Sequence, residues 1–129
     1  MKQALIDNYG YLFEDDLIDE IIKVGHSNSV DQGDVVIDYD QPVRYMPLLL
    51  DGAIKIMRQD SDGEELLLYF LESGDTCTMT MTCCMGNTKS EIRAVAEKDS
   101  KLIMIPVENM ATWIQKYKGW MSFVFDSYS

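Results

Sequence analysis

The chain has 129 residues, of which 47% are hydrophobic, enough for one compact domain with a buried core. Its 22 acidic and 11 basic residues give a formal net charge of −11, which repels nucleic-acid phosphates and excludes this segment as a DNA-gripping surface. No apolar run reaches membrane-spanning length and the first residues lack a signal-peptide core, so we expect a cytoplasmic protein with no membrane partner.

Residues 1–25 contain two apolar stripes at helical spacing. For the second stripe, Asp15 or Asp16 is the expected N-cap and Gly25 the expected C-cap. We therefore expect an N-terminal segment of short helices that packs on the rest of the domain.

Residues 26–105 change to short β-type runs separated by turn residues. The expected strands are, in chain order, Val35–Ile37, Leu48–Leu50, Ala53–Met57, Leu66–Leu71, Ile92–Ala96 and Leu102–Ile105. Asp51-Gly52 is typical of a type I′ hairpin turn, in which both central residues need positive φ, and Asp60–Gly63 predicts a further β-turn. Short strands at this rhythm predict a mainly β fold with flanking helices, a jelly roll or double-stranded β-helix.

Helical spacing returns over residues 106–129, first in a short helix that we expect to end at Lys118-Gly119. The residues after it are apolar on nearly every side of a second helix, and such a helix needs two partners, its own domain and something else. We expect the start of a dimerisation helix and a homodimer, with the candidate interface residues Trp120, Phe123, Val124 and Ser127.

Four anchors occur in order along the chain: Gly33, Gly52 after a leucine run, the turn at Asp60–Glu65, and Gly74-Asp75. Their order and spacing resemble the cyclic-nucleotide-binding-like β-roll, the N-terminal sensor domain of Crp/Fnr-type bacterial transcription regulators. The sequence from Glu64 to Cys84 is similar to that of a Bacteroidetes-type subgroup of the family. The resemblance implies one structural domain: a helical segment (1–25), a β-roll sensor core (26–105), and a short helix with the start of a dimerisation helix (106–129). It also implies DNA binding only through a C-terminal domain that is absent from this sequence.

The resemblance further implies a ligand cassette between Gly74 and Ser90. In family members that bind cyclic nucleotides, the cassette carries an aromatic residue, a glycine and a glutamate that holds the ribose, and later an Arg-Ser pair whose arginine holds the phosphate. Met79 stands at the glutamate position and cannot accept a ribose hydrogen bond as a carboxylate does; Lys89 stands at the arginine position without its planar fork. The candidate ligand residues are Gly74, Asp75, Thr76, Cys77, Thr78, Met79, Lys89 and Ser90. We expect no cofactor, and these substitutions weigh against a cyclic nucleotide held in the usual mode.

Two interpretations of the cassette stay open. In the first, Lys89, Ser90 and a threonine series line a pocket for an anionic small-molecule effector. In the second, the methionines of the cassette fill a collapsed pocket, since methionine readily fills irregular gaps.

Metal binding and enzymatic activity have little support in the sequence. Cys77, Cys83 and Cys84 lack the repeated pairs of a zinc site, and small buried thiols are the simpler interpretation, with a redox role left undecided. His26 is the only histidine, so neither the metal site of a cupin enzyme nor a nucleophile–base set is available. We therefore predict a non-enzymatic effector-sensing and dimerisation domain of a Crp/Fnr-family regulator with an unknown ligand. The alternative is a stand-alone β-roll that binds a ligand or protein without binding DNA.

Overall fold

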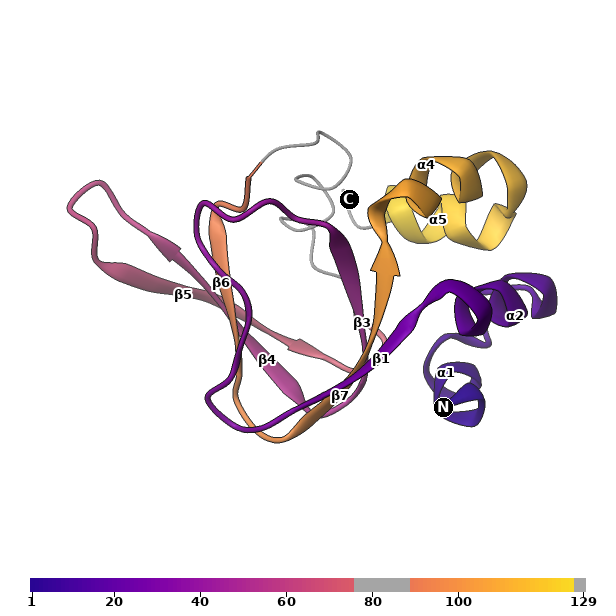
Figure 1. The fold of residues 1–129 in the computed structure, drawn as a ribbon, viewed down its shortest axis with the longest axis horizontal. Coiled ribbons are helices and arrows are strands. Elements are labelled where there is room, and N and C mark those ends of the chain that lie inside the picture. The colour runs from indigo at the N-terminus through magenta and orange to yellow at the C-terminus, as the bar shows by residue number, and fades with distance from the viewer. Residues whose placement is uncertain (76–88, 127–129) are drawn as a thin grey trace.

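The computed structural model describes residues 1–75 and 89–126, in which seven strands form two sheets flanked by four helices. The elements are α1 (Lys2–Tyr9), α2 (Asp15–Val24), β1 (His26–Val30), β2 (Val35–Ile37), β3 (Tyr45–Asp51), β4 (Ala53–Gln59), β5 (Glu65–Glu72), β6 (Ile92–Ala96), β7 (Ser100–Pro106), α4 (Val107–Lys116) and α5 (Lys118–Asp126). One sheet has the order β1-β7-β3 and the other β2-β6-β4-β5, with every pair antiparallel. Figure 1 shows the strands wrapped into a roll, with the helices gathered on one side and the β4–β5 hairpin projecting from the other. The predicted mainly β roll with flanking helices is confirmed.

The first core lies between the two sheets. Along β4, buried Ile54 and Ile56 alternate with half-buried side chains, the period expected of a strand with one face inward. The other buried members come from both sheets: Val30, Leu49, Leu71, Ile92, Ala94, Ala96 and Leu102. The four-stranded sheet is therefore packed on its inner face.

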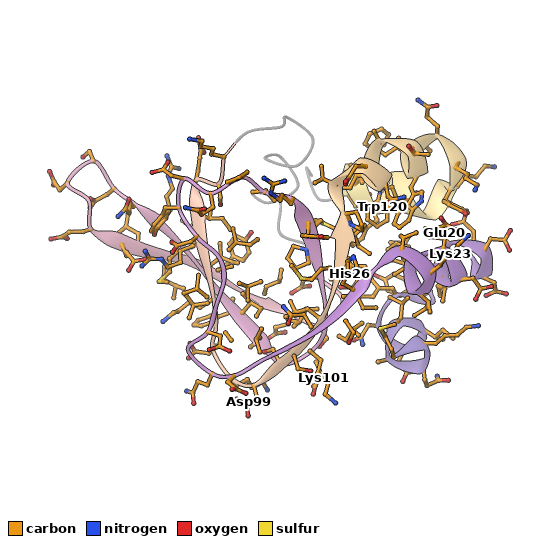
Figure 2. All side chains as sticks on the ribbon, viewed as in Figure 1. Glu20, Lys23, His26, Asp99, Lys101 and Trp120 are labelled. Atoms are coloured by element: carbon orange, nitrogen blue, oxygen red, sulfur yellow. The ribbon has the colours of Figure 1, made fainter. Side chains whose placement is uncertain are left out.

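The second core lies between the three-stranded sheet and the helices. Leu49 and Leu102 belong to the first core, whereas Leu48 and Ile103, their neighbours on β3 and β7, belong to the second. A sheet covered on both faces explains why these strands are continuous apolar runs in the sequence. Aromatic side chains fill much of this second core: Tyr9, Phe13, Trp113, Tyr117, Trp120 and Phe123. Figure 2 shows Trp120 in the helical part of the molecule.

The predicted hairpin at Asp51-Gly52 is wrong. β3 ends at Asp51 and pairs with β7, whereas β4 begins at Ala53 and pairs with β5 and β6, so the chain crosses here from one sheet to the other. Gly52 has φ +111°, and a Cβ at this position would collide with the side chain of Ser100. The glycine is needed for close approach of two chain segments, not for a type I′ turn.

The predicted β-turn at Asp60–Gly63 is confirmed as the tip of the β4–β5 hairpin. Gly63 has φ +83°, and the Asp60 carboxylate accepts hydrogen bonds from the backbone N–H groups of Asp62 at 2.8 Å and Glu64 at 2.9 Å. The carboxylate thus closes its own turn, as aspartate commonly does.

The N-cap prediction for α2 is wrong by one residue. The N-cap is Glu14, and Asp15 and Asp16 occupy the first turn, where negative charge interacts favourably with the helix dipole. Gly25 is the C-cap, as predicted.

The predicted helix end at Lys118-Gly119 is also wrong. α4 ends at Lys116, and Lys118 begins α5. The Gly119 N–H donates to Glu14 Oε1 at 2.9 Å, so a carboxylate from the α1–α2 connection satisfies a donor in the first turn of α5. None of the helices in residues 1–75 and 89–126 is long and apolar enough to cross a membrane.

Candidate functional site

The cassette begins at a tight turn that follows β5. Gly74 has φ +88°, which residues with side chains rarely adopt, and its N–H donates to the Leu49 carbonyl at 3.4 Å. Asp75 Oδ2 accepts from the Glu72 N–H at 2.9 Å, and the Asp75 N–H donates to the Glu72 carbonyl at 3.0 Å. The Asp75 carboxylate therefore closes the turn, and this pair of residues sets the direction in which the cassette leaves β5.

Helix α1 contacts this turn through Tyr9 and the adjoining strand β3 through Tyr9 and Asn8. The Tyr9 hydroxyl oxygen lies 3.2 Å from the Asp75 carbonyl oxygen and 3.3 Å from that of Leu49. The Asn8 side-chain amide donates to the Leu50 carbonyl at 3.0 Å. Burial raises the pKa of the Tyr9 hydroxyl far above its ordinary value, so the group stays protonated and acts as a donor. The N-terminal helix, β3 and the start of the cassette are thus held together at one point.

The cassette ends beside the segment Asp40–Pro42. The Ser90 N–H donates to the Gln41 carbonyl at 2.9 Å, and the Asp40 N–H donates to the Ser90 carbonyl at 2.9 Å. Pro42 and Lys89 form an isolated antiparallel bridge. Backbone pairing therefore places Lys89 and Ser90 against a loop that comes from a distant part of the sequence.

The Ser90 side chain is buried, whereas that of Lys89 is exposed. The Ser90 hydroxyl lies 2.9 Å from the Ile92 carbonyl oxygen and 3.2 Å from the Ile92 nitrogen. Ser90 thus organises the entry into β6, and Lys89 is the residue of the pair that a ligand can reach.

Four side chains join β5 and β6 to the segment that leads into Asp40. Arg93 Nε donates to Asp38 Oδ1 at 2.8 Å, and Arg93 Nη1 donates to Glu65 Oε1 at 3.2 Å. The Tyr39 hydroxyl donates to Glu65 Oε2 at 3.0 Å, and the guanidinium carbon of Arg93 lies 4.7 Å from the Tyr39 ring centre. The hydrogen bond from Arg93 lowers the pKa of Asp38, and partial burial with the hydrogen bond to Glu65 raises the pKa of Tyr39 to about 12. We call these four residues the Arg93 cluster.

A hollow of about 590 Å³ lies beside Lys89. Its lining residues are Pro42, Val43, Arg44, Tyr45, Lys89, Val107 and Glu108. The volume falls within the roughly 300–1,000 Å³ typical of small-molecule sites. Two cations and one carboxylate give the lining a net positive charge, which suits an anionic group. The Val107 N–H donates to the Arg44 carbonyl at 3.0 Å, so this N–H is already used within the protein.

The structure places four of the predicted ligand residues at the two anchored ends of the cassette. Gly74 and Asp75 begin the cassette, and Lys89 and Ser90 end it. The other four, Thr76, Cys77, Thr78 and Met79, lie outside the described residues, as do the remaining two cysteines, Cys83 and Cys84. Their part in ligand binding stays a prediction.

The predicted dimer residues of α5 face the interior of their own chain. Trp120, Phe123 and Val124 are buried in the helical core, and Ser127 lies outside the described residues. Packing within the same chain explains the apolar pattern, because the other helices and the three-stranded sheet already cover this face of α5. Phe125, 60% exposed, is the aromatic side chain of α5 that a partner can reach. A homodimer through α5 stays a prediction.

Sequence reasoning missed the residues that hold the two ends of the cassette. Arg93 and Asp38 are 55 positions apart, and Tyr9 and Asp75 are 66 positions apart, so no local pattern pairs them. The one available signal was Arg93, a charged residue inside an otherwise apolar strand.

In residues 1–75 and 89–126, no three or more His, Cys, Asp or Glu side chains gather in a group that could hold a metal ion. His26 begins β1, and its ring meets that of Tyr45 edge-on with 5.6 Å between centroids. This ring contact with Tyr45 is a packing contact.

Comparisons with known proteins identify a family for this fold. Residues 27–117 match the family described as the cyclic nucleotide-binding domain. No curated protein matches the chain.

Among solved structures, a Ruegeria pomeroyi protein assigned as cyclic nucleotide binding is 14% identical with a TM-score of 0.76, over 97% of this chain and 57% of that one. The sensor domain of the transcriptional regulator DNR from Pseudomonas aeruginosa is 18% identical with a TM-score of 0.75, over 93% of this chain and 80% of that one. A mutant regulatory subunit of a cAMP-independent protein kinase A from Trypanosoma brucei, bound to cAMP, is 15% identical with a TM-score of 0.72, over 82% of this chain and 40% of that one.

These structural similarities show the fold alone, and the chain spans 57% of the length of the Ruegeria protein. The family match carries more weight, because residues 27–117 run from β1 to the C-cap of α4 and include the whole roll. The chain therefore belongs to the cyclic nucleotide-binding domain family.

Proposed function

We propose that this domain senses a small anionic effector at the cassette and serves as the sensor of a transcription regulator. The observation that carries the proposal is the hollow beside Lys89, where Lys89 and Arg44 bring positive charge to the end of the cassette. Lys89 stands at the position where the resemblance to Crp/Fnr-type regulators places the phosphate-binding arginine. A lysine ammonium attracts an anion as a point charge and does not require a planar two-oxygen partner.

The proposed ligand differs from a cyclic nucleotide held in the usual way. Met79 has no carboxylate to accept a hydrogen bond from a ribose hydroxyl, and Lys89 has no bidentate fork for the cyclic phosphate. The ligand class that suits these residues is a small metabolite with one exposed anionic group and no need for ribose recognition.

In the proposed sensor, the signal leaves the cassette through Tyr9. Its hydroxyl contacts Asp75 at the start of the cassette, and its ring meets Phe123 of α5 edge-on, with centroids 5.9 Å apart. A ligand that binds two conformations of the cassette with different affinities would shift the equilibrium between them. If each conformation fixes a different position of α5, the free-energy difference in binding sets how far the population of α5 positions changes. We further propose that α5 pairs two copies of the chain through Phe125, and that a separate domain contacts DNA, because a net charge of −11 does not suit phosphate binding.

The test is thermal stabilisation of the purified chain by cyclic AMP, cyclic GMP and a panel of small anionic metabolites. We expect a selective rise in Tm with at least one non-nucleotide anion, lost in Lys89→Ala and retained in Lys101→Ala. Lys101 is a matched control, because it is an exposed lysine close to the β6–β7 turn, at the other end of β6 from Lys89 (Figure 2). An anion-induced shift of equal size in wild type and Lys89→Ala would contradict the proposed site. A shift with cyclic AMP that disappears in Lys89→Ala would restore the usual ligand.

A further inference from the structure

Strand β5 carries a run of exposed apolar side chains. Leu66, Leu67, Leu68 and Phe70 are each between 40% and 52% exposed. In the described part of the chain, β5 pairs with β4 only and lies at the end of the strand order β2-β6-β4-β5. The backbone groups along its outer edge are therefore not used by a neighbouring strand of this sheet.

Among residues 1–75 and 89–126, the position and composition of β5 leave this edge without a neighbouring strand. Figure 1 shows the β4–β5 hairpin projecting from the roll, away from the helices. Edge strands are commonly protected by a charge or a proline inside the strand, but residues 66–71 contain neither. An open apolar edge of this kind is a template for a further strand.

Apolar and charged side chains share the face of the sheet that continues from β5. Phe70 lies opposite Lys55, Lys55 opposite Val95, and Val95 opposite Val35. Directly paired residues place their side chains on the same face of a sheet, and at the far end of this row Val35 is also largely exposed. A strand added beside β5 would extend a face on which Phe70, Leu67 and Val35 lie among the charged side chains of Lys55 and Arg93.

The charges around β5 indicate which partner fits. Glu64 and Glu65 precede the apolar run and Glu72 follows it. If two copies of β5 paired antiparallel along their full length, one of the first two glutamates would lie opposite Glu72 of the other copy, and like charges opposite each other are destabilising. The net charge of −11 adds repulsion between copies. A strand with basic residues at both ends would meet these glutamates with opposite charge.

We propose that β5 is the docking edge for an extended segment of a partner protein, apolar in its centre and basic at both ends. The segment adds to the four-stranded sheet as a strand beside β5. Backbone hydrogen bonds supply part of the affinity, Leu67 and Phe70 contact its apolar side chains, and Glu64 and Glu72, one at each end of the run, select for its basic ends.

The test uses a labelled synthetic peptide of alternating valine and threonine with a pair of lysines at each end, titrated with the full chain and followed by fluorescence anisotropy. We expect saturable binding, weakened about tenfold or more by Phe70→Lys, as for an apolar anchor at an interface centre. Val35→Lys, an exposed valine on the same face at the opposite edge, is the matched control and should retain the affinity. In ¹H–¹⁵N spectra the shifts caused by the peptide should concentrate in β5 and β4.

A charge exchange tests the selection of basic ends. The double variant Glu64→Lys with Glu72→Lys should prefer a peptide with glutamates at its ends over the lysine-flanked one. Phe70→Lys and Val35→Lys are checked for unchanged thermal unfolding. Leu67→Lys replaces Phe70→Lys if the latter fails to fold. The proposal is overturned by absence of saturable binding to the lysine-flanked peptide, or by equal binding to wild type and Phe70→Lys. It is also overturned by a wild-type dimer in sedimentation that Phe70→Lys dissociates, because the occupant is then a second copy.

Discussion

The hydroxyl oxygen of Tyr9 lies 3.2 Å from the carbonyl oxygen of Asp75, so an N-terminal helix touches the chain where the cassette begins. The ring of the same tyrosine stacks on Phe13 with centroids 5.3 Å apart and meets Phe123 of α5 edge-on. One side chain thereby contacts the cassette, the N-terminal helices and the C-terminal helix. In the proposed sensor this makes Tyr9 the residue through which movement of the cassette reaches α5.

Tyr9→Phe keeps these ring contacts and removes only the donor. We expect the free energy of unfolding to fall by about 1 kcal/mol, because the carbonyl groups of Leu49 and Asp75 lose a buried hydrogen-bond donor. Urea denaturation measures the change, and Tyr11→Phe, at an exposed tyrosine, is the control that should leave stability unchanged. Unaltered stability together with unaltered amide exchange at Gly74 would show that the hydroxyl does not hold the turn.

A second prediction concerns acid stability and rests on Asp38. Its hydrogen bond from Arg93 lowers the pKa of Asp38 in the folded chain below its unfolded value. The resulting stability is fully present above the unfolded-state pKa and is lost as the pH falls through the folded-state pKa. Asp38→Asn should therefore show a shallower loss of stability than wild type when urea midpoints are compared from about pH 6 to about pH 2. Identical acid dependence in the two proteins, or an unshifted carboxyl titration of Asp38 by NMR, would contradict the prediction.

A third prediction separates local from global stability at the end of the cassette. Arg93→Ala releases the segment that leads into Asp40, which pairs with Ser90. We expect faster hydrogen exchange at the Asp40 and Ser90 amides with little change in the urea midpoint, because exposed ion pairs contribute little to global stability. Arg58→Ala, at an exposed arginine of β4, should leave both amides unaffected. Equal protection of these amides in Arg93→Ala and wild type would mean that the Arg93 cluster does not hold this segment.

Much of the fold is predictable because it is local. Ile92–Ala96 has the same bounds as predicted, since its inward side chains alternate along one strand. β1 (His26–Val30) was not among the expected strands, because four of its five residues are exposed and its strand character comes from pairing with β7. Only long-range pairing could reveal that strand.

The site is predictable at its ends and not in its supports. Gly74-Asp75 and Lys89-Ser90 mark the limits of the cassette in the sequence, and the structure anchors both pairs. The supports come from residues far away along the chain, and their side chains carry no local signature of that role. The predicted hairpin at Asp51-Gly52 is wrong for the same reason, because Gly52 is required by its close contact with Ser100, which is distant in the sequence.

The fourth prediction uses two glycines with positive φ to separate backbone strain from collision. Gly52→Ala faces both, because φ is +111° and the new Cβ meets Ser100, whereas Gly33→Ala has φ +91° and nothing within 4 Å. Strain in this backbone region costs about 1–2 kcal/mol, and overpacking adds about 1–3 kcal/mol. We therefore expect Gly33→Ala to lose only the first amount in urea denaturation and Gly52→Ala to lose both. Equal losses in the two variants would mean that the contact with Ser100 relaxes freely.

The last prediction distinguishes the inner and outer faces of α5. Trp120 is fully buried and its indole N–H donates to the Met110 carbonyl at 3.1 Å, so Trp120→Ala leaves a cavity between α4 and α5 and removes this hydrogen bond. We expect a loss of about 3–5 kcal/mol in the free energy of unfolding. Phe125→Ala, on the exposed face, should change it by no more than about 0.5 kcal/mol.

Self-association should depend on Phe125 on the exposed face of α5 and not on Trp120 on its buried face. If α5 pairs two copies, sedimentation velocity should show Phe125→Ala shifted toward the monomer, with stability at high dilution unaffected. Trp120→Phe, which keeps an aromatic ring in the core, should retain the association of wild type. A monomeric wild type across the accessible concentrations, or a dimer that Phe125→Ala leaves intact, would remove α5 from the pairing surface and leave its aromatic residues a role only in the core of their own chain.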